Sequence, residues 1–205
     1  MSKLVVVGTV AFDKIETPFG KTDKILGGAG TYIGLAAKKF GIDTTIVSVI
    51  GGDFPEEYIN IFKERDINIE GLKMVEDGKT FFWSGRYHND MNSRDTLDTQ
   101  LNVLADFQPV VPASYKDAKI VMLGNLHPLV QLSVIEQMEN PELVVLDTMN
   151  FWMDNALEDL KKVIAKVDVI TINDEEARQL SGEYSLVKAA REIEKMGPKY
   201  VVIKK

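Results

Sequence analysis

A cluster of glycines directly ahead of a predicted helix is the stretch of the chain best suited to hold a ligand. Gly27, Gly28 and Gly30 precede the apolar segment that ends at Gly41. Glycine has no Cβ, so it adopts positive φ and lets a ligand approach the backbone closely. A helix beginning here would point the unpaired N–H groups of its first turn at that ligand. A tight strand-to-helix turn is the simpler structural interpretation of a lone glycine cluster.

Polar side chains follow several of the predicted strands. In open parallel sheets, ligands bind beyond the carboxyl ends of the strands. The residues that could line such a rim are Asp13, Asp53, Asn125, His127, Asp147 and Asn173.

Two short acidic patterns have a structural explanation beside a chemical one. Asn173 with Glu176 fits a capping box at the start of a helix, and so does Asp53 with Glu56. For Asp53, capping is favoured over chemistry. For Asn173 and Glu176 both roles can hold, because a cap would also orient the carboxylate.

The helix after the glycines shows an apolar stripe. Ile33, Ala36, Ala37 and Phe40 recur at helical spacing, which predicts that this face packs against a core. Gly41 stands where a C-terminal cap favours glycine.

Strand and helix patterns alternate along most of the chain. Short β-branched runs predict buried strands, and longer amphipathic segments predict helices between them. This alternation implies a mostly parallel central sheet with helices on both faces. The predicted strands are 3–8, 44–50, 119–124, 143–147, 167–172 and 200–203. Besides the helix that follows the glycines and ends before Gly41, the predicted helices are 53–65, 129–138, 155–166, 173–181 and 186–196.

Two segments depart from the alternation. Residues 12–26 read as a short hairpin, and residues 67–90 read as short antiparallel strands with a turn at Asp77-Gly78. We expect these segments to form a small β lid on a single α/β domain that spans residues 1–205. Residues 88–101 are polar and irregular, and they predict a mobile loop.

The composition narrows the class of protein. The net charge is −7, the charged fraction is 27% and there is no cysteine. The acidic balance argues against nucleic acid or an anionic membrane as the main partner, and the lack of cysteine excludes disulfides and thiolate metal sites. We expect a cytoplasmic protein, because the sequence shows no signal peptide and no membrane-spanning run.

The ordered set of motifs resembles the ribokinase-like sugar kinases, also called pfkB carbohydrate kinases. The resemblance covers the whole chain and matches the N-terminal two thirds of that family. The matching elements are Gly8 followed by Asp13, Gly27-Gly28-x-Gly30 entering a helix, Gly51-x-Asp53, a lid-like region, and Asn173-x-x-Glu176.

The resemblance implies ATP-dependent phosphorylation of a hydroxymethyl group on a sugar or nucleoside. Asp13 matches the aspartate that accepts hydrogen bonds from substrate hydroxyls, and Gly28 and Gly30 match glycines on which the sugar lies. Asn125 falls near a polar residue that contacts the sugar. Asn173 and Glu176 match the motif that organises Mg²⁺ and phosphate through water, so the implied cofactors are ATP and Mg²⁺.

Two departures from the family pattern bear on the substrate. Tyr32 and Ala11 stand where the family often has asparagine. A site without those amides should prefer a different hydroxyl pattern or a larger, more aromatic substrate than ribose. We therefore expect Tyr32 to tune specificity.

A third departure concerns catalysis. In the family, the strand that matches 200–203 leads to further sheet and to a Gly-x-Gly-Asp motif that supplies the catalytic base and the anion hole. We find no such motif in these residues. The expectation is a substrate-binding portion of a longer kinase, with no catalytic residue of its own.

Two alternatives stay open. One is a non-catalytic protein that binds sugars or nucleosides on the same scaffold. The other is an interaction module, in which an exposed sheet edge pairs with another chain or exposed Phe81 or Trp83 supports a homodimer through the lid.

Overall fold

The computed structural model describes residues 2–91 and 93–205 of the chain. These residues divide into two compact units. One comprises the N-terminal strand up to Val7 together with Pro109–Lys205, and the other comprises Gly8–Gln108. The prediction of a single domain carrying a lid stays a prediction.

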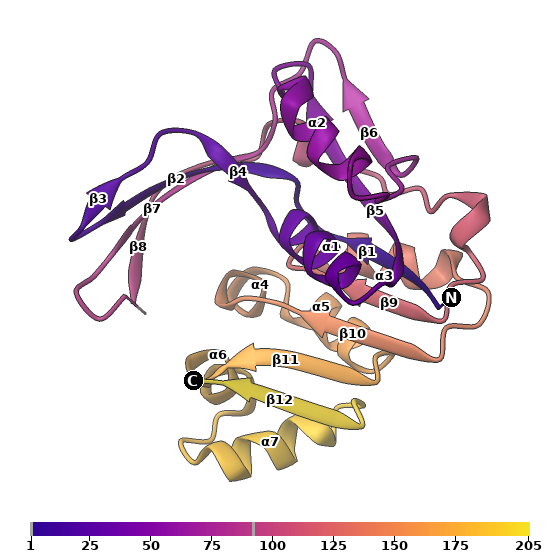
Figure 1. Cartoon of the computed structure of the whole chain (residues 1–205). Coiled ribbons are helices and arrows are strands. Elements are labelled where there is room, and N and C mark those ends of the chain that lie inside the picture. Colours follow the sequence, from indigo (N-terminus) through magenta and orange to yellow (C-terminus); the bar gives the residue numbers. More distant parts are fainter. Residues whose placement is uncertain (1, 92) are drawn as a thin grey trace. The chain divides into compact units, whose positions relative to one another are not determined.

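The first unit is built on a parallel sheet (Figure 1). Neighbouring strands run in the order β12-β11-β10-β9-β1, and every pairing along this path is parallel. The strands are β1 (Lys3–Val7), β9 (Ile120–Leu123), β10 (Leu143–Asp147), β11 (Val169–Asn173) and β12 (Tyr200–Lys204). Each lies within or close to a strand predicted from a β-branched run, so the α/β prediction is confirmed here.

Helices connect these strands. They are α3 (Pro128–Gln137), α4 (Asn150–Asn155), α5 (Leu157–Ile164), α6 (Asp174–Ser181) and α7 (Leu186–Glu194), with a 3₁₀ turn at Ala113–Tyr115. The predicted helix 155–166 begins later, at Leu157, because Ala156 has an extended φ of −148° that separates α5 from α4. The short helix α4 was not predicted.

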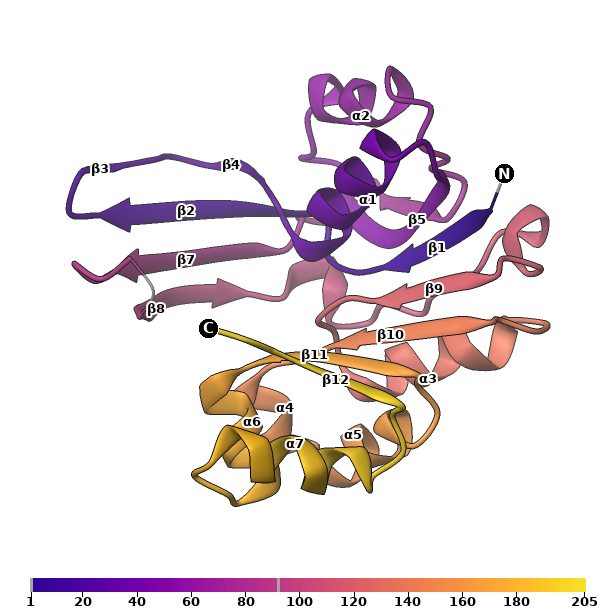
Figure 2. The same cartoon turned by 60° about the horizontal axis from the view of Figure 1, so that its bottom comes forward.

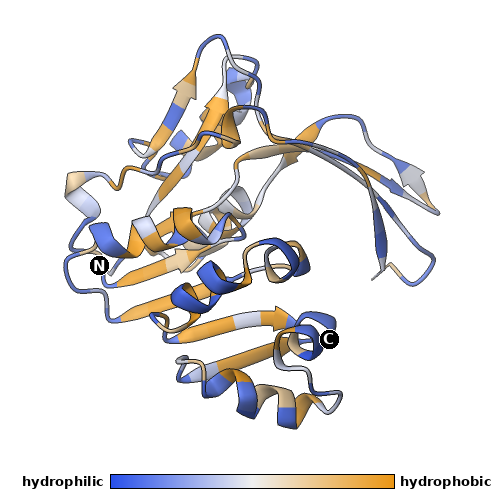
Figure 3. Cartoon of the chain, turned by 180° about the vertical axis from the view of Figure 1, so that it is seen from behind, coloured by the Kyte–Doolittle hydropathy of each residue, from blue (hydrophilic) through white to orange (hydrophobic). Residues whose placement is uncertain are grey.

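The two faces of this sheet differ in burial. Figure 2 shows α4, α5, α6 and α7 gathered on one side of β11 and β12. Ile170 and Ile172 point to a fully buried face, whereas Val202 on the opposite face is 47% exposed. The strands are largely hydrophobic, and the helices carry hydrophobic and hydrophilic sides, as Figure 3 shows.

The second unit contains a parallel strand pair with two helices. Its elements are α1 (Ala29–Lys39), β5 (Asp43–Gly51), α2 (Glu56–Lys63) and β6 (Leu72–Val75). β6 pairs in parallel with β5, with Ser48 opposite Leu72. The prediction that residues 67–75 form antiparallel lid strands is therefore wrong. α2 supplies the crossover that a parallel pair requires.

Helix α1 buries a different face from the one predicted. Phe40 is 83% exposed, and the buried positions include Gly30, Gly34 and Ala37. A Cβ on Gly34 would lie 2.9 Å from Ile46 Cδ1 of β5. Gly34 makes the close approach to this strand, and Leu35 also packs against the buried cluster that contains Ile46, whereas the large Phe40 lies outside this contact.

A small mixed sheet completes the second unit. Its strands are β2 (Ala11–Thr17), β3 (Gly20–Lys21), β4 (Ile25–Gly27), β7 (Phe82–Tyr87) and β8 (Arg94–Gln100). β2 and β7 are parallel, and the pairs β2–β3, β2–β4 and β7–β8 are antiparallel. The predicted hairpin at 12–26 is confirmed. The described part of the predicted loop 88–101 contains strand β8, and Asn92 lies outside the described residues.

The turn at Asp77-Gly78 does not close a hairpin. The Gly78 N–H donates to the Val75 carbonyl at 3.0 Å, as a turn requires. However, β6 pairs with β5, whereas β7 pairs with β2 and β8. A 3₁₀ turn at Asn102–Leu104 follows β8.

Asp53 does not cap α2. The N-cap of this helix is Pro55, which has no side-chain capping bond. Asp53 Oδ1 instead accepts hydrogen bonds from the backbone N–H and the hydroxyl of Thr80, at 2.7 and 2.8 Å. Its carboxylate therefore anchors the segment that enters β7.

Aromatic packing joins the small sheet to α2. The ring of Phe12 stacks on Phe54 with centroids 5.5 Å apart, and both rings contact Tyr58. The buried cluster around them consists of Val10, Phe12, Ile46, Ile50, Phe54, Phe62 and Ile67. In the described part of the chain, no helix has the length and apolar character needed to cross a membrane.

Candidate functional site

Asp13 lies against the glycine turn. β4 runs antiparallel to β2, with Ala11 opposite Gly27 and Asp13 opposite Ile25, so the turn returns beside the carboxylate. Asp13 accepts a hydrogen bond from the backbone N–H of Gly28. A Cβ on Gly27 would lie 2.1 Å from Asp13 Oδ2, so only glycine leaves room for the carboxylate. Gly27 therefore leaves space for the Asp13 carboxylate, and Gly28 donates its N–H to it.

Burial changes the acidity of this carboxylate. Loss of solvation raises the pKa of Asp13, and the hydrogen bond from the Gly28 N–H lowers it by a smaller amount. The side chain is half-buried and belongs to a sheet face, so it remains available to a ligand. An ionised carboxylate is a strong acceptor for hydroxyl groups.

The other glycines of the turn hold protein backbone. Gly28 has a φ of 94°, and a Cβ there would lie 2.2 Å from the Thr9 carbonyl oxygen. A Cβ on Gly30 would lie 2.9 Å from the Gly8 carbonyl oxygen. Both glycines are therefore required for the close packing of the 8–9 segment, and their contact with a substrate stays a prediction.

The first N–H groups of α1 are already satisfied. Ala29 N–H donates to the Thr9 hydroxyl at 3.1 Å, and Gly30 N–H donates to the Thr9 carbonyl at 2.9 Å. The Gly28 N–H goes to Asp13. The expectation that these groups await a ligand is wrong, because Thr9 and Asp13 take them.

Tyr32 lies next to the strand that pairs with Asp13's strand. Its hydroxyl donates to the Leu26 carbonyl at 3.2 Å, which ties α1 to β4. The side chain is nevertheless 57% exposed. The ring therefore borders the Asp13 region with a large accessible surface.

In the first unit, Asn125 follows β9 and has a fixed amide orientation. Its Oδ1 accepts from Trp152 Nε1 at 2.8 Å, and its Nδ2 donates to Met149 Sδ at 3.0 Å. His127 stands nearby, with its ring 5.1 Å from Trp152 and its Nδ1 accepting from the Leu129 N–H. His127 thus caps α3 and packs against Trp152.

Asn173 and Glu176 form the predicted capping box at the start of α6. Asn173 Oδ1 accepts from the Glu176 N–H, and Glu176 Oε2 accepts from the Asn173 N–H, both at 2.8 Å. Glu176 is only 6% exposed. The local spacing of the two residues was enough to predict this geometry.

Further polar groups lie at the same edge of the sheet. Asp147 Oδ1 is 3.2 Å from Lys204 Nζ and 3.5 Å from the Thr171 hydroxyl. Lys204 is also the register partner of Asn173. The carboxyl ends of β10, β11 and β12 therefore present an acid, an amide and a cation together.

Comparison with known proteins shows to which family the chain belongs. A family model described as pfkB family carbohydrate kinase matches residues 1–205. The chain belongs to the pfkB family of carbohydrate kinases. The resemblance inferred from the motifs is thereby confirmed.

The relatives of this pfkB-family chain include a cytidine kinase. A cytidine kinase from Thermococcus kodakarensis is 27% identical over 207 residues, which cover 99% of this chain and 73% of the relative.

Solved structures show the fold. A nucleoside kinase from Burkholderia thailandensis in complex with inosine has a TM-score of 0.75 at 15% identity, covering 98% of this chain and 70% of its own. A ribokinase from Arabidopsis thaliana, complexed with ribose and ATP, has a TM-score of 0.74 at 16% identity, covering 99% and 72%. The fold is therefore ribokinase-like.

The residues predicted for the site of this pfkB-family chain fall into two groups. Asp13, Gly28, Gly30 and Tyr32 lie together in the second unit. Asn125, Asn173 and Glu176 belong to the first unit: Asn125 follows β9, Asn173 ends β11, and Glu176 lies in the first turn of α6.

Trp152 and Lys204 were missed by sequence reasoning. The aromatic pair Phe151-Trp152 shortly after a predicted strand was an available signal for the first. Nothing in the sequence marks Lys204, because its role depends on the pairing of β12 with β11.

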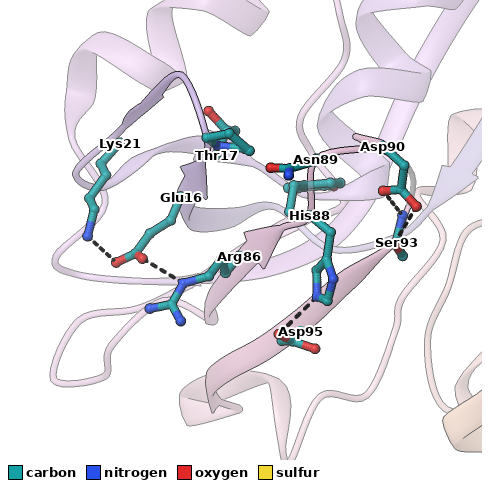
Figure 4. A pocket seen from close by; sticks show the side chains of 11 residues that line it. Glu16, Thr17, Lys21, Arg86, His88, Asn89, Asp90, Ser93 and Asp95 are labelled. Carbon is teal, nitrogen blue, oxygen red and sulfur yellow. Dashed lines mark hydrogen bonds and ion pairs between the residues drawn. The ribbon is translucent and has the colours of Figure 1, made fainter.

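A surface pocket of the small sheet is separate from these groups (Figure 4). Glu16 forms ion pairs with Arg86 at 3.0 Å and with Lys21 at 3.2 Å, and both partners lower the pKa of its carboxyl. His88 Nε2 lies 3.0 Å from Asp95. Lys21 and Arg86 both pair with Glu16 in this pocket, and none of the predicted site residues lines it.

Proposed function

We propose that this chain is the substrate-binding portion of an ATP-dependent kinase that phosphorylates a hydroxymethyl group of a sugar or nucleoside. The observation that carries the proposal is the half-buried Asp13 carboxylate, held by the Gly28 N–H in a turn that only glycines can form. The family membership of the chain supports the reaction class.

Each predicted residue has a role in this proposal. Asp13 accepts hydrogen bonds from substrate hydroxyls, and the backbone at Gly28 and Gly30 borders the substrate. Tyr32 tunes specificity through its exposed ring. Asn125 offers its amide in an orientation that Trp152 fixes.

The cofactors in this proposal are ATP and Mg²⁺. Bound ATP with Mg²⁺ would supply the phosphoryl group. Among the residues described, no group of three or more acidic, histidine or cysteine side chains could hold a metal ion. Mg²⁺ keeps several waters and is usually bound through only one or two carboxylates, so Asn173 and Glu176 fit a role in which they orient water around the ion.

The residues that deprotonate the substrate and hold the developing charge are proposed to lie in sequence beyond these 205 residues. This part of the proposal is supported by the 73% of the cytidine kinase relative that the chain covers. The small sheet of β2, β3, β4, β7 and β8 is proposed as the lid that excludes water from the reaction.

A homodimer through this lid belongs to the same proposal. Support comes from β8, an outer strand of the small sheet whose residues are all exposed. Phe81 and Trp83 are half-buried, so their exposure does not support a dimer.

The acidic, cysteine-free composition supports a cytoplasmic location.

The test is phosphoryl transfer from ATP by the full-length protein, measured with a panel of sugars and nucleosides. Asp13→Ala should lower kcat/KM for the accepted substrate by roughly tenfold to hundredfold, because hydrogen bonds to a charged acceptor contribute about 1.5–3 kcal/mol. Asp23→Ala, which removes an exposed carboxylate of the same region, is the matched control.

An Asp13→Ala enzyme with unchanged kcat/KM would sink the assignment of this residue. Saturable substrate binding by the full-length protein without ATP consumption would instead favour the non-catalytic binding protein.

A further inference from the structure

We propose that Trp83 is a stacking platform for a flat ring, which makes a nucleoside rather than a simple sugar the ligand of the Asp13 site. The inference rests on the proposed function, since it takes Asp13 as the residue that binds substrate hydroxyls. It adds a specificity-determining residue and a substrate class.

The register of the small sheet places Asp13 and Trp83 in one row of neighbouring strands. Asp13 and Trp83 are direct partners in the parallel ladder between β2 and β7. Paired residues of adjacent strands project from the same face, and the strands lie about 4.8 Å apart. A ligand that contacts the Asp13 carboxylate is therefore within reach of the Trp83 ring.

The indole is seated on a glycine. A Cβ on Gly85 would lie 2.1 Å from Trp83 Cη2 and 2.4 Å from Cζ2. Gly85 itself is buried, although it belongs to a strand of a small surface sheet, whereas Trp83 is half-buried and keeps part of its ring accessible. Any larger residue at position 85 would lift the ring away from the sheet.

Polar contacts hold the ring at its edge. Trp83 Nε1 donates to the Thr96 hydroxyl at 3.3 Å. The Arg94 guanidinium lies 5.9 Å from the ring centre, at the outer limit of a cation–π contact. Arg94 is exposed, so a ligand ring can replace this contact at little cost.

The neighbours on this face suit a flat apolar ring. Ile25 is paired with Asp13 on one side, and Ile15 is paired with Gly85 in the next row. Both are half-buried. Hydroxyl recognition at Asp13 beside an apolar, aromatic surface at Trp83 matches a ligand with a sugar and a base. Stacking on an aromatic side chain tolerates any base, because every base has a π-face.

The experiment measures binding of inosine, cytidine, ribose and fructose to the protein by calorimetry. Trp83→Leu should weaken nucleoside binding about tenfold or more and change the binding of the free sugars by less than about twofold. Gly85→Ala keeps the indole but displaces it, and should also weaken nucleoside binding. Phe19→Leu removes an aromatic ring that is 84% exposed at the β2–β3 turn, and should change nothing.

Fluorescence gives a readout that a purely structural role would not move. The sequence has two tryptophans, so Trp83→Phe leaves Trp152 as the single emitter, and the comparison with wild type isolates the emission of Trp83. Nucleosides should quench the emission of the protein that retains Trp83, since a stacked base contacts that indole.

The outcomes separate the two proposals. Wild-type protein that binds neither sugars nor nucleosides overturns the proposed function and this inference with it. Nucleoside affinity that is unchanged in Trp83→Leu overturns this inference alone. Quenching that is equally strong in wild type and in Trp83→Phe also overturns it.

Discussion

The carboxylate of Asp13 lies where partial burial disfavours its charged form. Loss of solvation raises its pKa, and one backbone N–H from Gly28 only partly offsets this effect. Holding a partly desolvated charge costs free energy. The same desolvation strengthens the hydrogen bonds that an ionised acceptor makes to a bound hydroxyl. The residue is thus more useful for binding than for stability.

Ligand binding should therefore weaken in acid at a higher pH than an ordinary aspartate would allow. The ionised carboxylate accepts hydroxyl protons, and its pKa lies above the usual value of about 3.9. Calorimetric titration of the bound nucleoside or sugar between about pH 4 and about pH 8 would show affinity falling through the raised pKa. Affinity that is flat across this range would contradict the assignment.

Asp13→Asn is the control for this profile. It should bind weakly at every pH, because an amide keeps one acceptor but has no charge. The folded-state pKa lies above the unfolded one, so the carboxylate destabilises the native state at neutral pH and ceases to do so in acid. The Asn variant should accordingly unfold at pH 7 at no lower temperature than wild type.

At the scale of elements, many local patterns predict the structure, whereas the pairings between distant segments do not follow from them. The capping box of Asn173 and Glu176 spans three residues, so its geometry follows from spacing alone. The strands of the first unit follow from their β-branched runs. Strand β8 carries no apolar alternation, since all its residues are exposed, and it forms only because β7 offers a partner.

Other wrong predictions have the same physical cause, namely contacts with segments that are distant in the sequence. The predicted apolar stripe of α1 includes Phe40. This residue is exposed, because the helix makes its close approach to Ile46 through a small residue instead. Asp53 has a capping pattern, yet Thr80 from a distant segment takes its carboxylate. The contact of Asp13 with Gly27 and Gly28 depends on the register of β2 and β4, which no local pattern fixes.

The cap of α6 should contribute measurably to stability. Asn173→Ala removes the acceptor for the Glu176 N–H and should lower the free energy of unfolding by about 1 kcal/mol. Urea unfolding would measure the loss. Ser185→Ala is the matched control, because Ser185 occupies the N-cap of α7 without a side-chain capping bond. Equal effects of the two substitutions would show that the capping box contributes nothing beyond helix propensity.

At the scale of the whole molecule, the predicted site residues are shared between two compact units. Hydroxyl recognition is assigned to the second unit, and the polar ends of β9, β10, β11 and β12 belong to the first. Family membership and a ribokinase-like fold extend over the entire chain. Binding of the acceptor substrate is consequently the activity that these 205 residues should retain by themselves.

Calorimetric titration of the 205-residue chain with ribonucleosides and sugars, in the absence of ATP, tests the central claim most directly. The account predicts saturable binding of at least one of these ligands, weakened roughly tenfold to hundredfold by Asp13→Ala and unaffected by Asp23→Ala. Binding that survives Asp13→Ala unchanged, or no binding of any ligand in the panel, would contradict it.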